Sequence, residues 1–300
     1  MCIFLWTTDD PEYALVIANN RDEFLARPTS EAQWRNADLE PDPNGSILCG
    51  RDMPRSGKGG TWLGITRSGA FGVLTNYTEL IPRHLIFTPA RSRGVLVSEW
   101  LQNSHTQSPD AFLADVAAHK DEYAAFNLVV GQVGARTQVG YATNRGAEPH
   151  VLARDEPRGP MHALSNGLLS DPWPKVTDAE RRLGDALDAH RGDREHLIDA
   201  LFDVLRTSRG TPQSRSDMRR TIQVDPMSLP STADGTALSL WPYGTHSWYG
   251  TRTATVCLVT RETPARIIFI ERDIYTLDHH GELLHSHPGR SERRFEFTQK

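Results

Sequence analysis

The sequence predicts an α+β fold in which helices cover antiparallel sheets. Apolar segments occur in pairs separated by short turns, which is typical of β-hairpins. Amphipathic segments lie between these pairs, and such helices bury one face against a sheet. The order along the 300 residues is strands, helices, strands, helices, strands, and no repeat or linker divides them. We therefore expect a single domain over residues 1–300, with a long loop or lid at 207–236.

The first 25 residues predict a hairpin. Two apolar segments, 2–7 and 13–18, flank turn residues at 9–12, and the second segment runs into a polar stretch at 19–23. Because the apolar character is almost continuous, both faces of these strands should be covered. A turn near residue 10 places residues near 20 beside residue 2.

The remaining elements follow in order. Residues 28–60 are rich in Pro and Gly and predict a loop, and a second hairpin at 61–66 and 70–75 ends at Asn76. Periodicity and cap residues predict the other elements. These are helices at 89–103, 108–120, 177–190 and 194–206, strands at 126–130, 138–142, 253–259 and 266–270, and an edge strand at 294–298.

Composition excludes several classes of function. With 33 basic and 38 acidic residues the net charge is −5, so nothing indicates a nucleic-acid-binding surface. No run of about 18 apolar residues predicts a membrane span. The apolar start meets Asp9 and Asp10 without a preceding basic residue, which does not resemble a signal peptide. The three cysteines fit neither a zinc pattern nor a disulfide framework, so we expect a cytoplasmic protein.

Cys2 is the candidate nucleophile, because it follows Met1 directly. Removal of Met1 would give one residue both a thiol and a free α-amine, and such an amine can act as general base for its own nucleophile. At the end of the pairing strand, Arg21 would stabilise a thiolate, and Asp22 or Glu23 would orient an α-ammonium. The alternatives are an inert strand cysteine and a solvated charge cluster.

Several motifs occur in a fixed order along the chain. They are Met1-Cys2-Ile3, Ala-Asn-Asn-Arg-Asp-Glu-Phe at 18–24 with Arg27-Pro28, Gly-Gly-Thr-Trp-Leu-Gly at 59–64, Leu-Thr-Asn-Tyr at 74–77, Phe-Asn-Leu at 126–128, Leu-Ser-Asn at 164–166 with Pro172-Trp173, and Tyr-Gly-Thr-Arg-Thr at 249–253. Together they resemble the transport and Golgi organization protein 2 family, also called the NRDE family, from residue 1 to the Glu-Phe-Thr near the C-terminus.

The resemblance implies a four-layer αββα sandwich of the N-terminal-nucleophile hydrolase type. The family is distantly similar to choloylglycine hydrolases and penicillin V acylases, which use a cysteine after the first Met. Carried over by position, Cys2 is the nucleophile, Arg21 lies beside it, and Asp22 holds the α-amine, with Glu23 as its rival. Two asparagines and a late arginine complete the implied site; these are Asn76, Asn166 and Arg252.

The implied roles agree with acyl-transfer chemistry. Negative charge develops on the carbonyl oxygen in the transition state, and neutral amide donors such as those of Asn76 and Asn166 stabilise it. Either asparagine could instead satisfy backbone groups at a turn or strand end. We expect His279, His280, His285 and His287 to lie in a solvated loop rather than to bind a metal.

Two functions are therefore expected in order of preference. The first is an amidohydrolase or acyltransferase that acts on an acyl amide or thioester, cleaves C–N bonds other than peptide bonds and needs no cofactor. The second is a non-catalytic carrier, because the resemblance links the family to haem trafficking and to lipid or acyl-CoA homeostasis. The weak net charge favours a hydrophobic small molecule, an acyl compound or haem, as the ligand in either case. A scaffold with a decayed active site is the third alternative.

Overall fold

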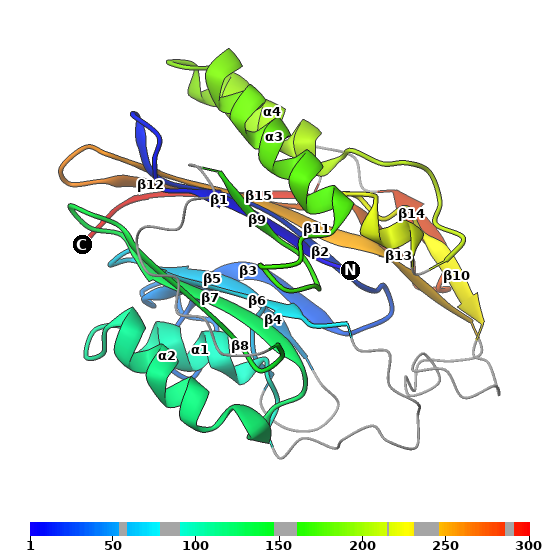
Figure 1. Cartoon of the computed structure of the whole chain (residues 1–300), viewed down its shortest axis with the longest axis horizontal. Coiled ribbons are helices and arrows are strands. Elements are labelled where there is room, and N and C mark those ends of the chain that lie inside the picture. The colour runs from blue at the N-terminus through cyan, green and yellow to red at the C-terminus, as the bar shows by residue number, and fades with distance from the viewer. Residues whose placement is uncertain (54–58, 79–90, 147–160, 215, 231–245, 286–290) are drawn as a thin grey trace.

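Two stacked antiparallel sheets lie between two pairs of helices (Figure 1). The computed structural model describes residues 1–53, 59–78, 91–146, 161–214, 216–230, 246–285 and 291–300. Helices α1 (Val95–Asn103) and α2 (Pro109–Ala118) lie on one side of the sheets, and α3 (Pro174–Ala189) and α4 (Arg194–Leu205) on the other. The predicted four-layer αββα sandwich is confirmed.

The first sheet contains the N-terminal hairpin. Within the described residues it has seven strands in the order β15-β12-β11-β2-β1-β9, with β10 also paired to β11. Ile3 pairs with Asn20, so the predicted hairpin register is confirmed. The strands are β1 (Ile3–Thr7), β2 (Tyr13–Phe24), β9 (His162–Leu164), β10 (Met227–Pro230), β11 (His246–Thr260), β12 (Arg266–Asp273) and β15 (Glu292–Thr298).

The second sheet follows the chain order from β3 to β8. Its strands are β3 (Thr29–Arg35), β4 (Ile47–Asp52), β5 (Leu63–Thr66), β6 (Ala70–Asn76), β7 (Phe126–Gln132) and β8 (Gln138–Thr143). The predicted loop at 28–60 is therefore wrong over β3 and β4. Its Pro and Gly residues mark the turns around these strands, whereas Ile47, Leu48 and Cys49 are buried. Strands β13 (Tyr275–Leu277) and β14 (Leu283–His285) form a separate pair.

Alternate side chains of the first hairpin belong to two different apolar cores, one on each face of the first sheet. Phe4 and Ile17 belong to the core between the sheets, whereas Ile3 and Val16 belong to the core beneath α3 and α4. Successive side chains of a strand point to opposite faces. By the same alternation Cys2 and Arg21 face the layer between the sheets, and Asp22 faces the helices.

Helices α2 and α4 begin where their capping residues predict. Ser108 accepts a hydrogen bond from the Ala111 amide at the start of α2, and Asp193 accepts one from the His196 amide at the start of α4. Helix α3 begins at Pro174, three residues before the predicted start at 177, because proline fits the first turn of a helix. This earlier start brings residue 175 into the helix.

Part of the predicted lid at 207–236 packs against the first sheet. This stretch contains the 3-10 turn η3 (Asp217–Arg219) and strand β10, and Met218, Ile222 and Val224 are buried in the core beneath α3 and α4. Residues 231–236 and 89–90 lie outside the described residues. The helix expected at 89–103 begins only at Val95, so the prediction is wrong over 91–94, which form a bridge and a turn. A lid function of the stretch stays a prediction. None of the helices in the described part of the chain has the length and apolar character to cross a membrane.

Candidate functional site

The N-terminal ammonium lies at the end of β2, inside the protein. The Met1 nitrogen forms an ion pair with Asp22 Oδ2 at 2.8 Å and donates a hydrogen bond to the Tyr249 hydroxyl at 2.5 Å. Thr251 donates to the other oxygen of Asp22, Oδ1, at 2.7 Å. Tyr249 and Thr251 both belong to β11, and Thr251 lies directly opposite Asp22 in the pairing of β11 with β2. The Asp22 carboxylate is thus held between the chain terminus and its neighbouring strand.

Lys175 binds the first peptide unit from the opposite side. Its Nζ donates to the Met1 carbonyl oxygen at 2.5 Å, and the residue is only 1% exposed. A cation in the first turn of a helix is disfavoured by the helix dipole. Burial lowers the pKa of both the Lys175 ammonium and the Met1 ammonium, and the Asp22 carboxylate opposes this effect. Sequence reasoning missed Lys175, although it follows the Pro172-Trp173 motif.

The Cys2 thiol lies on the other side of the Asp22 backbone. Its Sγ is 3.7 Å from the Asp22 carbonyl oxygen, and its own carbonyl accepts a hydrogen bond from Ser165 Oγ at 2.7 Å. Burial raises the pKa of the Cys2 thiol, while the nearby N-terminal ammonium lowers it. The thiol therefore needs a base to become nucleophilic at neutral pH.

A buried hydrogen-bond network ties this end of the first sheet to the second. Thr75 on β6 donates to the Ser165 carbonyl at 2.8 Å, and Asn127 on β7 donates to the Gly167 carbonyl at 2.9 Å. The Tyr141 hydroxyl donates to Asn127 Oδ1 at 2.8 Å. The polar Asn127 inside the apolar strand at 126–130 was the sequence signal for this network. It fixes the position of Ser165, and through Ser165 that of Cys2.

The hydrogen bonds and ion pairs of the two predicted site arginines are with groups other than the thiol, although the charge of Arg21 contributes to lowering the pKa of the Cys2 thiol. The Arg21 guanidinium lies over the Trp62 ring at 4.2 Å and pairs with Asp52. Arg252 donates to the carbonyls of Leu25 and Arg27 at 2.8 and 2.6 Å and so holds the chain after β2. These contacts give Arg252 a positioning role at the end of the strand.

The two candidates for the acidic residue have different neighbours. Glu23 lies 3.8 Å from the guanidinium of Arg21 and 3.7 Å from that of Arg27, and one of its oxygens accepts from the Phe24 amide. Asp22 is the carboxylate that contacts the chain terminus.

The two predicted asparagines also differ. Asn76 is exposed at the end of β6. Asn166 is 4% exposed, and its carbonyl accepts from the Thr78 amide at 2.8 Å. Its side-chain oxygen has no hydrogen-bond partner within the part of the chain that the structure describes.

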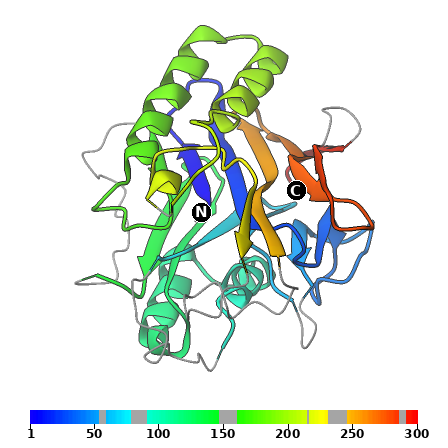
Figure 2. The same cartoon turned by 90° about the vertical axis from the view of Figure 1, so that its right-hand side faces the viewer.

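A cavity of about 420 Å³ opens beside Met1. Thr78 lines it and donates to the Met1 sulfur at 3.5 Å, and Trp173 lines it and packs in the same apolar core as Met1. Figure 2 faces the end of the sandwich on which the N-terminus lies. The lining residues are Tyr77, Thr78, Asn166, Gly167, Leu168, Asp171, Trp173 and Arg219.

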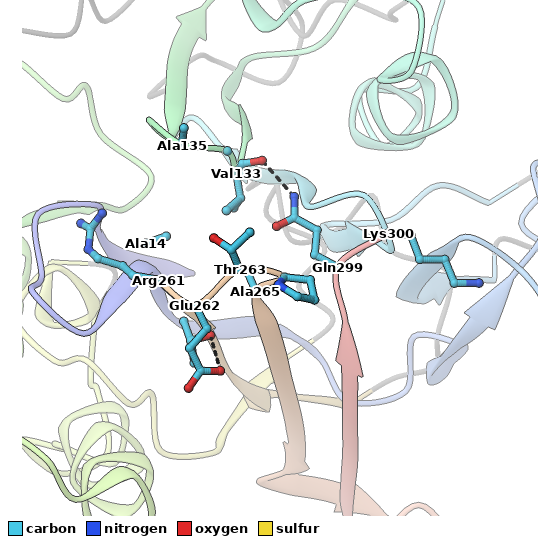
Figure 3. Close-up of a pocket in the computed structure, with 12 residues that line it drawn as sticks. Ala14, Val133, Ala135, Arg261, Glu262, Thr263, Ala265, Gln299 and Lys300 are labelled. Carbon is cyan, nitrogen blue, oxygen red and sulfur yellow. Dashed lines mark hydrogen bonds between the residues drawn. The ribbon is translucent and has the colours of Figure 1, made fainter.

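Another cavity, of about 370 Å³, lies at the opposite end of β2 (Figure 3). Ala14 near the start of β2 lines it, and Gln299 donates to the Val133 carbonyl at 3.1 Å at its edge. Neither cavity has a cysteine in its lining, but Thr78 in the lining of the first one contacts Met1, the residue next to Cys2. The cavity beside Met1 is therefore the candidate substrate site.

The fold and the site define an αββα protein whose N-terminal amine and adjacent cysteine are held at the ends of paired strands. The sequence matches the family described as Transport and Golgi organisation 2 over residues 1–276, and the chain belongs to this family. It is 31% identical over 289 residues to the Transport and Golgi organization 2 homolog of Mus musculus. This match covers 93% of this chain and 95% of the relative. The human homolog is 32% identical with the same coverages, and the Drosophila melanogaster protein is 30% identical, with coverages of 96% and 97%.

Two solved structures have weak similarity to the chain. A conjugated bile acid hydrolase from Clostridium perfringens matches with a TM-score of 0.38 and 9% identity, over 100% of this chain and 98% of that one. A Caenorhabditis elegans N-acylethanolamine-hydrolyzing acid amidase ortholog matches with a TM-score of 0.37 and 12% identity, over 73% and 98%. These TM-scores are too low to support a conclusion about function.

Proposed function

We propose that the protein is a cysteine N-terminal-nucleophile hydrolase or acyltransferase that acts on an acyl amide or thioester. The observation that carries the proposal is the double contact of Asp22. Its carboxylate lies 2.8 Å from the terminal nitrogen, and its carbonyl oxygen lies 3.7 Å from Cys2 Sγ. One residue therefore holds both an amine and the thiol at the same strand end.

Removal of Met1 would move the terminal amine by one residue. Consecutive Cα atoms are about 3.8 Å apart, so the new α-amine of Cys2 would still lie close to the Asp22 carboxylate. The Tyr249 hydroxyl, which now accepts from the Met1 ammonium, would become available to the new amine. Lys175 would lose the Met1 carbonyl as its acceptor.

The electrostatics of the site support general-base catalysis by that amine. Burial raises the pKa of the Cys2 thiol, so the thiol is neutral at pH 7. Burial lowers the pKa of the Met1 ammonium, and the Cys2 α-amine that would replace it would lie near the same Asp22 carboxylate. A base with a pKa close to the working pH is the most effective one. In the proposed reaction the thiol proton passes to the Cys2 α-amine as Sγ attacks the acyl carbon.

Asn166 is the better supported of the two proposed oxyanion donors, because it lines the cavity beside Met1. The Lys175 ammonium, which now binds the Met1 carbonyl, would lose this acceptor when Met1 leaves and would add a positive charge next to Cys2. Asn76 and Arg21 stay predicted members of the site.

The test combines intact-mass measurement with turnover. We expect the purified protein to lack Met1 and to hydrolyse a simple acyl amide or thioester, and we expect Cys2→Ala to be inactive with an unchanged circular dichroism spectrum. Cys49→Ala is the matched control, because Cys49 is buried in β4, away from the terminus. Complete retention of Met1, or full activity of Cys2→Ala, would overturn the proposal.

A further inference from the structure

The lining of the cavity beside Met1 contains an arginine, Arg219, that forms no ion pair within the described residues. The Arg219 guanidinium lies 4.9 Å from the centre of the Trp173 ring. No ion pair of the described residues includes Arg219, whereas Arg21 pairs with Asp52 and Arg51 with Glu40. A guanidinium that stacks on an aromatic face keeps its N–H fork free for a planar anion.

Arg219 is supplied by an anchored segment. It ends the short turn η3, its amide donates to the Ser216 carbonyl at 3.1 Å, and the preceding Met218 is buried in the core. Its backbone position on the cavity wall is therefore fixed by packing rather than by a partner charge. The lining also contains the exposed carboxylate of Asp171, which repels anions. An anion in the cavity is therefore favoured only close to Arg219.

Asn166 adds a buried hydrogen-bond acceptor to the cavity lining. Asn166 is 96% buried, and its Oδ1 finds no donor among the described residues. Buried polar atoms normally have partners, so this oxygen is a place for a donor supplied by a ligand. Asn166 also lies on the Met1 side of the cavity, since its carbonyl binds the amide of Thr78, which contacts Met1.

We propose that this cavity holds the leaving group of the substrate and that Arg219 binds an anionic group on it. The inference rests on the proposed function of Cys2. The substrate class is thus an acyl compound with a carboxylate or phosphate on the leaving side. The Asn166 oxygen would accept from an amide N–H, which favours an amide over a thioester.

The proposed reaction is the hydrolysis of the C–N bond of an acyl amide in two steps. Cys2 Sγ forms a bond to the acyl carbon, the C–N bond breaks, and the thiol proton passes through the Cys2 α-amine to the leaving nitrogen. Water then cleaves the thioester, which releases the acid and restores the thiol. The anion on the leaving group is unchanged and serves recognition only.

The experiment compares four probes with the same acyl chain. These are N-hexanoylglycine and its neutral primary amide, and the hexanoyl thioesters of phosphopantetheine and of neutral N-acetylcysteamine. We expect kcat/KM for the anionic member of a pair to exceed that of the neutral member by on the order of tenfold, as for one charge-assisted hydrogen bond. The pair that shows the larger effect identifies the anion as carboxylate or phosphate.

Arg219→Gln should remove this preference by raising KM for the anionic probes. Arg220→Gln is the matched control, because Arg220 is exposed and does not line the cavity. Equal kcat/KM for the members of both pairs, or a preference that survives Arg219→Gln, would overturn the inference while the proposed function stands.

Binding to Cys2→Ala separates the two proposals further. If the wild-type protein turns over none of the four probes, the proposed function fails. Calorimetric binding of N-hexanoylglycine to Cys2→Ala that is lost in Cys2→Ala/Arg219→Gln would still support the subsite. Absence of binding by both anionic probes to Cys2→Ala would overturn it.

Discussion

The hydroxyl of Tyr249 links the backbone carbonyl of Asp22 to the ammonium that the Asp22 carboxylate binds. It donates to the Asp22 carbonyl at 3.3 Å and accepts from the Met1 ammonium, which the Asp22 carboxylate binds at 2.8 Å. Burial and the neighbouring Asp22 charge raise the pKa of Tyr249 well above 10, so the phenol keeps its proton. A single tyrosine thereby fixes both the backbone and the ionic contact at the strand end.

Asp22→Asn should destabilise the fold strongly. The change leaves the terminal ammonium, of Met1 or of Cys2 once Met1 is removed, and the Lys175 ammonium without a nearby buried carboxylate. The loss of one partner of a buried pair costs about 3–5 kcal/mol. Urea unfolding at pH 7 measures the change in the free energy of unfolding. Glu23→Gln should cost less than about 1 kcal/mol, because the Glu23 carboxylate is partly exposed and lies 3.7–3.8 Å from its two arginine partners. Equal effects of the two variants would contradict the assigned contacts.

Lys175→Met should change how stability depends on pH. Burial lowers the pKa of Lys175 below its ordinary 10.5 in the folded state, so between the folded and unfolded pKa values the unfolded chain binds more protons. The Lys175 contribution to the free energy of unfolding therefore rises with pH in that window. Urea unfolding between pH 7 and 10 should show this rise in the wild type relative to Lys175→Met. Parallel curves for the two proteins would show that Lys175 keeps an ordinary pKa.

Thiol labelling should be selective for Cys2. Cys49 and Cys257 are buried, and burial raises their pKa values to about 11 and about 12, whereas Cys2 is partly exposed. Since thiolates are the reactive form, iodoacetamide should modify Cys2 first, at a rate that increases as the pH rises past 9. Peptide mass spectrometry identifies the labelled residue. Labelling of all three cysteines at one rate in the folded protein would contradict the described burial.

Asn127→Leu should weaken the link between the sheets. The change leaves the Tyr141 hydroxyl and the Gly167 carbonyl without their partner, and each unsatisfied buried group costs about 1–3 kcal/mol. We expect a loss of about 2–4 kcal/mol in urea unfolding. Asn103→Ala, at the exposed last residue of α1, should stay within about 0.5 kcal/mol of the wild type. A neutral Asn127→Leu would show that the network adds nothing to stability.

Local patterns were sufficient to predict the first hairpin. Its register followed from a turn at one end and apolar segments on either side, and the structure pairs Ile3 with Asn20 accordingly. The same alternation separates the side chains of Arg21 and Asp22, which face opposite layers. The choice between Asp22 and Glu23 stayed open in the sequence, because it depends on Tyr249 and Thr251, which reach the site through the pairing of β11 with β2.

Long-range packing explains what the sequence did not predict. Lys175 reaches the Met1 carbonyl because α3 packs on the first sheet, and no local pattern encodes that contact. The strands at 29–35 and 47–52 were missed because their Pro and Gly neighbours indicated a loop. Haem or acyl-CoA carriage stays a prediction, and a hemin titration followed by absorbance would test the haem form of it.

The contacts of Met1 have a consequence for how the protein should be prepared. Any residue joined in front of Met1 turns its ammonium into an amide, which cancels the charge that pairs with Asp22. Met1 is also 8% exposed, so an affinity tag at this end has no direct path to the surface. Purification tags placed there would disturb the very groups under study, whereas the exposed side chain of Lys300 marks the other end as the safer attachment point.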